Sequence, residues 1–178
     1  MSKLIPDYVF DSIYDITPEL LEKHGVRGVL IDLDGTMASH KAALPPEKLS
    51  PFVHTLCDAG LRVLVFSNNR EARVGRFCQA LGVDFISRAG KPFAAGFRRA
   101  AEQLGLPLGQ IAVVGDQIFT DVFGGNRMGA LTCYVQTLDR HFFWINVRYQ
   151  IERGFIERGK KCCFCQRPFF PPPVSASC

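Results

Sequence analysis

The sequence contains no long apolar run. None approaches the roughly 20 residues that a transmembrane helix needs, and residues 1–6 lack the apolar core of a signal peptide. The seven cysteines lack the spacing of a disulfide framework, which favours a reducing compartment. These absences argue against a membrane-spanning or secreted protein, and we expect a cytoplasmic one.

An excess of charge of one sign is also missing. The 21 lysines and arginines outnumber the 17 acidic residues by only 4, so the charge balance does not require a nucleic-acid partner, and we expect none. We find no internal repeats. A chain of 178 residues, 47% of them hydrophobic, can form one domain with a sizeable core.

What the sequence does contain is a regular alternation of apolar runs and helical patterns. Such runs are typical of strands buried on both faces of a parallel sheet. We therefore expect an α/β, Rossmann-like, doubly wound parallel sheet with helices on both faces, over residues 27–159. Residues 1–26 are an entry segment packed on that core, and 160–178 a mobile tail rich in Cys and Pro. The expected strands cover residues 27–33, 61–66, 83–87, 111–115 and 130–135.

Two carboxylates follow the first expected strand. Asp32 and Asp34 come directly after the apolar run 29–31, within the sequence Asp-Leu-Asp-Gly-Thr. Strand alternation would point both to the same side, and open α/β sheets bind ligands at the carboxyl ends of their strands. The pair favours a hard cation, which prefers oxygen ligands. The plainer interpretation is an ordinary turn after a strand.

Further polar residues follow later elements that end at the same edge. Ser67 and Asn68 follow the second strand, Lys91 precedes a helix, and Asp116 and Asp121 follow the fourth strand. Plainer interpretations exist for three of them: Ser67 as a helix N-cap, Lys91 as a solvated lysine, and Asp121 as a charge that complements a helix start.

As an ordered set, these four motifs resemble those of the haloacid dehalogenase superfamily. The resemblance implies that Asp32 is the nucleophile that attacks phosphorus, and that Asp34 is the general acid and base. It also implies a Mg²⁺ site made by Asp32, Asp116 and the Asp34 carbonyl. The remaining implied roles are phosphoryl binding by Ser67, Asn68 and Lys91, and support from Asp121 and Thr36.

The spacing of the motifs bears on the substrate. The intervals from Asp34 to Ser67 and from Ser67 to Lys91 are filled by the expected loop, helices and strands, so no cap domain fits in either. The chain resembles the capless IIIA group, and within it the YqeG-type phosphatases, over residues 4–158. Gly35 is a departure, because these relatives commonly carry Asn there. Related organelle enzymes hydrolyse phosphatidylglycerophosphate, which suggests a lipid-borne phosphate. A protein phosphate, a small phosphometabolite or a non-enzymatic interaction protein are the alternatives.

Residues 140–161 combine aromatic and basic side chains. Trp144, Val147, Ile151 and Phe155 share roughly one helical face. Such a helix could lie on the inner face of an anionic membrane as a peripheral contact, or it could pack back on the domain with its basic face in water. The basic residues are Arg140, Arg148, Arg153, Arg158, Lys160 and Lys161. We expect that replacing Arg148, Arg153 and Arg158 would weaken binding to anionic vesicles and barely change turnover of a small soluble ester, because Asp32 and its partners are untouched.

The tail contains one Cys-x-x-Cys, within Cys162, Cys163 and Cys165. A structural zinc site needs four ligands. Because the sequence has no second Cys-x-x-Cys and no nearby histidine, we do not expect zinc here.

Overall fold

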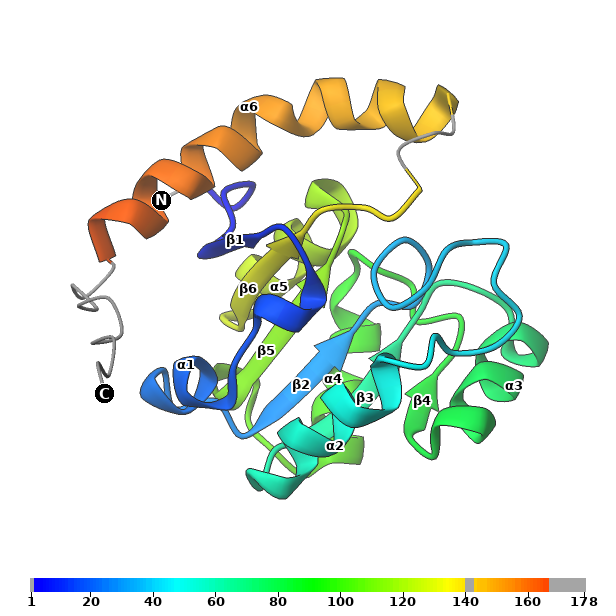
Figure 1. Ribbon diagram of the computed structural model, residues 1–178. Coiled ribbons are helices and arrows are strands. Elements are labelled where there is room, and N and C mark those ends of the chain that lie inside the picture. The colour runs from blue at the N-terminus through cyan, green and yellow to red at the C-terminus, as the bar shows by residue number, and fades with distance from the viewer. Residues whose placement is uncertain (1, 140–142, 167–178) are drawn as a thin grey trace, which may run out of the picture.

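The computed structural model describes residues 2–139 and 143–166, without the side chains of 162–166. Within these residues one sheet of six parallel strands runs in the order β1-β6-β5-β2-β3-β4 (Figure 1). The strands are β1 (Tyr8–Phe10), β2 (Gly28–Ile31), β3 (Arg62–Phe66), β4 (Asp84–Ile86), β5 (Ile111–Gly115) and β6 (Leu131–Val135).

Helices connect the strands and cover both faces of the sheet (Figure 1). The predicted doubly wound α/β fold is therefore confirmed, and no cap domain interrupts it between β2 and β5. The helices are α1 (Pro18–Lys23), α2 (Leu49–Asp58), α3 (Glu71–Leu81), α4 (Ala94–Leu104), α5 (Phe123–Met128) and α6 (Phe143–Gln166), with a π-helical turn at Ile118–Val122.

The hydrophobic core lies on the two faces of the sheet. On one face α1, α2 and α3 pack on the strands through residues such as Leu21, Val53 and Phe77. On the other face Phe97 of α4 packs against Phe66 of β3, with ring centroids 4.9 Å apart. Strands covered on both sides must be apolar throughout, which explains the continuous burial of β2 and β5.

The order of the strands reverses between β2 and β5. From β2 the chain proceeds outward to β3 and β4, whereas β5 leads to β6 on the other side. Crevices at such reversals, outside the carboxyl ends of the strands, are where doubly wound sheets bind ligands. Asp32 follows β2 and Asp116 follows β5, so the two carboxylates flank this crevice.

The entry segment contains a strand that the sequence did not predict. β1 pairs in parallel with β6 at the edge of the sheet. Asp7 fixes this edge, because its carboxylate accepts hydrogen bonds from the Thr132 N–H and hydroxyl at 2.8 and 2.9 Å. α1 has Thr17 as its N-cap and Pro18 as its first helical residue.

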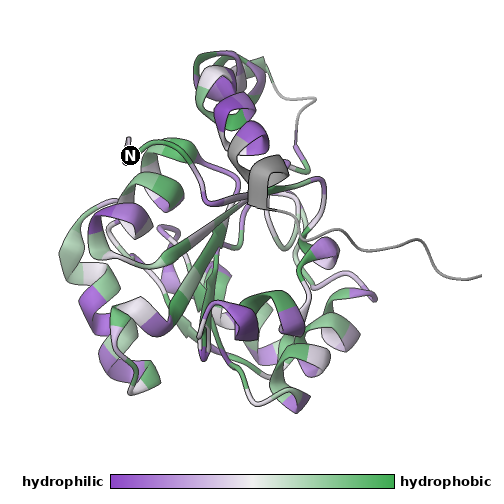
Figure 2. Cartoon of the chain, turned by 90° about the vertical axis from the view of Figure 1, so that its left-hand side faces the viewer, coloured by the Kyte–Doolittle hydropathy of each residue, from purple (hydrophilic) through white to green (hydrophobic). Residues whose placement is uncertain are grey.

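α6 runs past β1 and β6 (Figure 1) and is longer than predicted, since it extends to Gln166. The expected tail at 160–178 thus begins inside a helix. Residues 167–178 and the side chains of Cys162, Cys163 and Cys165 lie outside the described part of the chain. Gly159 permits a close approach to the entry segment, because a Cβ there would lie 2.7 Å from Pro6. Figure 2 looks along α6, which carries both hydrophilic and hydrophobic residues around its axis. Among the described helices none is long and apolar enough to span a bilayer.

Candidate active site

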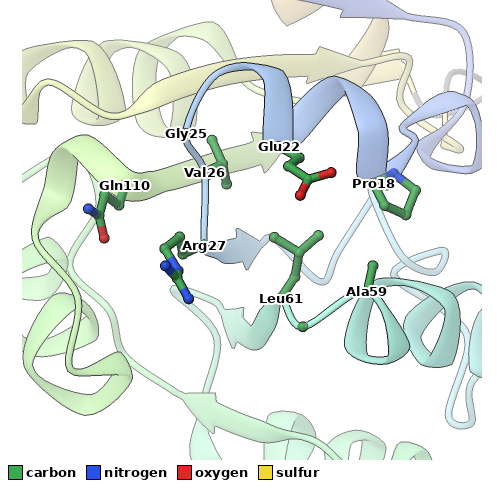
Figure 3. A pocket seen from close by; sticks show the side chains of 9 residues that line it. Pro18, Glu22, Gly25, Val26, Arg27, Ala59, Leu61 and Gln110 are labelled. Atoms are coloured by element: carbon green, nitrogen blue, oxygen red, sulfur yellow. The ribbon is translucent and has the colours of Figure 1, made fainter.

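Four of the motif residues, Asp32, Asp34, Ser67 and Asn68, line an open cavity of about 300 Å³ at the carboxyl edge of the sheet. A larger cavity, of about 450 Å³, lies at the opposite ends of the strands (Figure 3). Glu22, Arg27 and Gln110 line that larger cavity, and none of the motif residues does. The chemistry therefore belongs to the smaller cavity, which is lined by Asp32, Asp34, His40, Ser67, Asn68, Asn69 and Gln117.

Lys91 lies between two carboxylates in the interior. Its Nζ donates to Asp32 Oδ1 at 2.5 Å and to Asp121 Oδ1 at 2.7 Å, and all three residues are buried. Burial lowers the pKa of Lys91, but Asp121 and Asp32 outweigh this effect and hold the pKa above its ordinary value. Asn68 fixes the lysine backbone, accepting from the Lys91 N–H at 2.8 Å and donating to its carbonyl at 3.1 Å.

A third carboxylate gives this cluster an excess of negative charge. Asp32, Asp116 and Asp121 each offer an oxygen, and these oxygens lie within 4.8 Å of one another. Burial raises the pKa of Asp32 to about 8; Lys91 opposes the rise, while Asp121 and Asp116 add to it. The Lys91 ammonium and the Arg148 guanidinium, which contacts Asp116, leave one negative charge in excess. A divalent cation would offset this charge and lower the pKa of Asp32.

The cluster also has an atom suited to bind that cation. Asp116 is fully buried, and its Oδ1 has no hydrogen-bond partner among the described residues. A buried, unpartnered carboxylate oxygen is costly unless it has a ligand. The donor set consists of oxygens, which suits a hard divalent cation. The residues present therefore fit a metal, with Asp116 Oδ1 and Asp32 as its side-chain ligands.

Asp34 takes a different environment from Asp32. Arg73 of α3 donates to Asp34 Oδ1 from Nε at 2.9 Å and from Nη2 at 2.5 Å, and Asn69 donates to Oδ2 at 3.1 Å. In the sequence, Arg73 is one of several charged residues of α3. Its contact with Asp34, 39 positions earlier, depends on the fold and has no local signal.

The structure explains why residue 35 is glycine here. Gly35 has a φ of +91°, which side chains rarely adopt. A Cβ at this position would lie 2.5 Å from Asp116 Oδ2 and 3.0 Å from Thr137 Oγ1. The glycine at this position is thus tied to the position of the Asp116 carboxylate.

Ser67 and Thr36 are buried beside the cluster. Ser67 Oγ accepts from the Asn69 N–H at 3.1 Å, but α3 begins only at Glu71, after Arg70. The alternative of Ser67 as the N-cap of that helix is therefore wrong. Thr36 Oγ1 has no hydrogen-bond partner among the described residues, so its hydroxyl does not hold the loop by a side-chain bond.

Sequence reasoning missed His40, which lines the cavity. Its Nδ1 lies 2.5 Å from Oδ2 of buried Asp139, which also accepts from the His40 N–H and the Ser39 hydroxyl. Burial raises the pKa of Asp139, yet these hydrogen bonds outweigh burial and hold the pKa below its ordinary value. His40 and Asp139 are 99 positions apart in the sequence, so no local pattern predicts their contact.

The expectation that replacing Arg148 would leave the partners of Asp32 untouched is wrong. The Arg148 Nη2 donates to Asp116 Oδ2 at 2.8 Å. α6 does pack on the domain, through Glu152, Ile156 and Gly159, and of its predicted apolar face Phe155 joins this contact. Trp144 and Ile151 on that face remain 78% and 63% exposed.

A lysine among buried carboxylates, at the switch point of a capless parallel sheet, defines a hydrolase of the haloacid dehalogenase type. Residues 18–129 match the haloacid dehalogenase-like hydrolase family, and the chain belongs to it. It is a phosphatase of this family.

Particular relatives agree with that assignment. The chain is 37% identical over 158 residues to the "Probable phosphatase YqeG" of Bacillus subtilis, covering 88% of this chain and 92% of that protein. It is 28% identical over 146 residues to "Phosphatidylglycerophosphate phosphatase 1, chloroplastic" of Chlamydomonas reinhardtii, covering 77% of this chain and 54% of the relative.

A solved structure supports the fold. The 3-deoxy-D-manno-octulosonate 8-phosphate phosphatase of Yersinia pestis superposes with a TM-score of 0.52 over 86% of this chain and 93% of its own. Its 11% sequence identity limits that likeness to the fold.

Proposed function

We propose that the protein is a Mg²⁺-dependent phosphomonoesterase that works through an aspartyl-phosphate on Asp32. The observation that carries this proposal is the contact of Asp32 with Lys91 inside a cluster of three buried carboxylates. Bound Mg²⁺, held by Asp32, Asp116 and the Asp34 carbonyl, would supply positive charge to the phosphoryl oxygens.

In the first step an Asp32 oxygen attacks phosphorus, and the bond from phosphorus to the leaving oxygen breaks. Asp34 donates a proton to that oxygen, so an alcohol departs. Lys91, Ser67 and Asn68 at the cavity would hold the phosphoryl oxygens during transfer. In the second step Asp34 removes a proton from water as the water attacks phosphorus, which releases phosphate and restores Asp32.

The chemistry is tested with Asp32→Asn and with chelation. We expect turnover of 4-nitrophenyl phosphate to fall by about 10⁴-fold or more in the variant, since removal of a nucleophile costs on this scale. The exposed Asp84→Asn is the matched control, with unchanged rates. EDTA should abolish turnover and Mg²⁺ restore it. Substantial Mg²⁺-dependent turnover by Asp32→Asn would contradict the covalent route.

We further propose that the phosphate is carried by an anionic lipid, as in phosphatidylglycerophosphate. The name of the 28% identical relative supports this substrate class, and so does the open cavity. A third support is the exposed apolar stripe of α6, whose members are Phe143, Trp144, Val147 and Ile151. Arg148 connects the same helix to Asp116, so a membrane bound to the stripe would lie near the site.

The lipid proposal is tested with vesicles containing phosphatidylglycerophosphate, against soluble glycerol phosphate. At about 100° per residue, Arg158 and Lys161 project on the side of the stripe, whereas Arg153 and Lys160 project elsewhere. Changing the first pair to Gln should weaken vesicle binding by about 1 kcal/mol per charge. The second pair serves as the matched control. Equal rates on both substrates, without vesicle binding at low salt, would favour a protein or metabolite phosphate instead.

A further inference from the structure

α6 contacts the turn after β5 at two points, one helical turn apart. Arg148 Nη2 donates to Asp116 Oδ2 at 2.8 Å. Glu152 Oε1 accepts from the Ile118 N–H at 3.0 Å and from the Phe119 N–H at 3.4 Å. We call Arg148 and Glu152 the α6 clasp. The first contact holds a catalytic side chain, and the second holds the backbone that follows it.

The clasp is built into the interior. The Asp116 side chain is fully buried, the Glu152 side chain is 1% exposed, and that of Arg148 is 24% exposed. One turn further along, Ile156 packs with Ile118 and other apolar residues. These positions occupy one face of the helix, so the apolar contact fixes the rotation of α6 that directs the clasp at the turn.

The clasp leaves one oxygen of Asp116 available. Arg148 takes Oδ2, whereas Oδ1 has no partner among the described residues, and one oxygen of Asp116 lies within 4.8 Å of oxygens of Asp32 and Asp121. A carboxylate held at one oxygen cannot rotate freely, so its other oxygen keeps a fixed direction. Carboxylates that bind metals are commonly held in this way by a neighbouring hydrogen-bond donor.

Arg148 and Glu152 are farther from each other than each is from its partner in the turn after β5. Arg148 Nε and Glu152 Oε2 lie 3.8 Å apart, beyond hydrogen-bond distance, and both lack a partner among the described residues. The position of the guanidinium is therefore set by Asp116, and that of Glu152 by the backbone N–H groups. Each contact can be removed separately by mutation.

We propose that Arg148 is a positioning residue for the metal ligand Asp116, and that Glu152 holds the backbone of the same turn, so that α6 is part of the metal site. This inference rests on the proposed Mg²⁺ site. A guanidinium near a cation site also repels the cation, and the two effects have opposite signs. If positioning dominates, loss of Arg148 weakens Mg²⁺ binding; if repulsion dominates, its loss strengthens binding.

The test measures Mg²⁺ binding to the full chain by calorimetry, without substrate. We expect Arg148→Met to weaken Mg²⁺ binding by about 10- to 100-fold, the range found when such supporting partners are removed. Arg148→Lys, which keeps the charge and one donor, should have a smaller effect. Arg153→Met is the matched control, because Arg153 is exposed on the same helix, and its affinity should equal that of the wild type.

Thermal unfolding in metal-free buffer separates positioning from a loss of fold. A folded Arg148→Met with unchanged or tighter Mg²⁺ binding would overturn the inference. If that variant does not fold, Arg148→Gln, which removes the charge but keeps a polar side chain, decides by the same criterion. Wild-type protein that binds no Mg²⁺ would instead overturn the proposed metal site itself. Glu152→Ala, which leaves two N–H groups without an acceptor, should also weaken Mg²⁺ binding, whereas Glu152→Gln should retain it.

Discussion

The carboxyl edge of the sheet and helix α6 differ in how their roles are encoded. At the sheet edge, Asp32 and Asp116 stand directly after buried strands, so short motifs identify them. On α6, Arg148 and Glu152 lie among other charged residues, and their partners are more than 30 positions away. A catalytic site can therefore depend on side chains that resemble an ordinary solvated helix face in sequence.

Among the substitutions that test this comparison, we expect the largest effect on activity at Arg73, another arginine whose partner is distant in the sequence. Arg73→Gln removes the two guanidinium donors to Asp34 Oδ1, while Asn69 still donates to Oδ2. We expect kcat for 4-nitrophenyl phosphate hydrolysis to fall by about 100-fold, the low end of what general acid–base catalysis contributes. Arg76→Gln, exposed on the same helix, should leave kcat unchanged. Equal rates for the two variants would mean that the Arg73 contact is dispensable.

A second, smaller effect concerns Gly35, a residue of the first motif that lies close to Asp116. Gly35→Ala places a Cβ against Asp116 and requires a positive φ. Gly60→Ala requires a similar φ, +82°, but its Cβ meets nothing within 4 Å. Both variants should lose about 1–2 kcal/mol of unfolding free energy, measured with urea. Only Gly35→Ala should also lose Mg²⁺ affinity, and parallel losses of affinity in both would contradict this account of the glycine.

A third effect concerns the pH dependence of stability and Glu152. Burial raises the pKa of this carboxyl from 4.5 to about 7; Arg148 and the N–H groups of Phe119 and Ile118 oppose the rise, and Asp116 adds to it. Between these pH values the folded protein keeps a proton that the unfolded chain releases. Stability should therefore decline as pH rises through this interval, by on the order of 2 kcal/mol.

Glu152→Gln isolates this contribution because it keeps the accepting oxygen and cannot titrate. The difference in unfolding free energy between wild type and Glu152→Gln should change from pH 4.5 to 7 and be constant above. Curves for the two proteins that stay parallel over this range would show that Glu152 does not titrate there.

Much of the fold could be predicted because buried parallel strands need continuous apolar runs, as in β2 and β5. β1 escaped prediction, since it is three residues long, only partly buried, and its pairing depends on β6. The motif residues could be predicted because their types and order suit one chemistry. Arg73, Arg148 and Asp139 could not, because each acts through a contact that only the folded chain creates.

The central claim is that Asp32 becomes phosphorylated, and trapping that intermediate tests it most directly. Asp34→Asn should slow the attack of water on the intermediate, while 4-nitrophenyl phosphate, with its good leaving group, needs no acid to react. Acid quenching followed by mass spectrometry of peptides should then find phosphate on Asp32 when Mg²⁺ is present, and none in Asp32→Asn. Release of 4-nitrophenol with every Asp32 peptide unmodified, or with phosphate on another residue, would contradict the account.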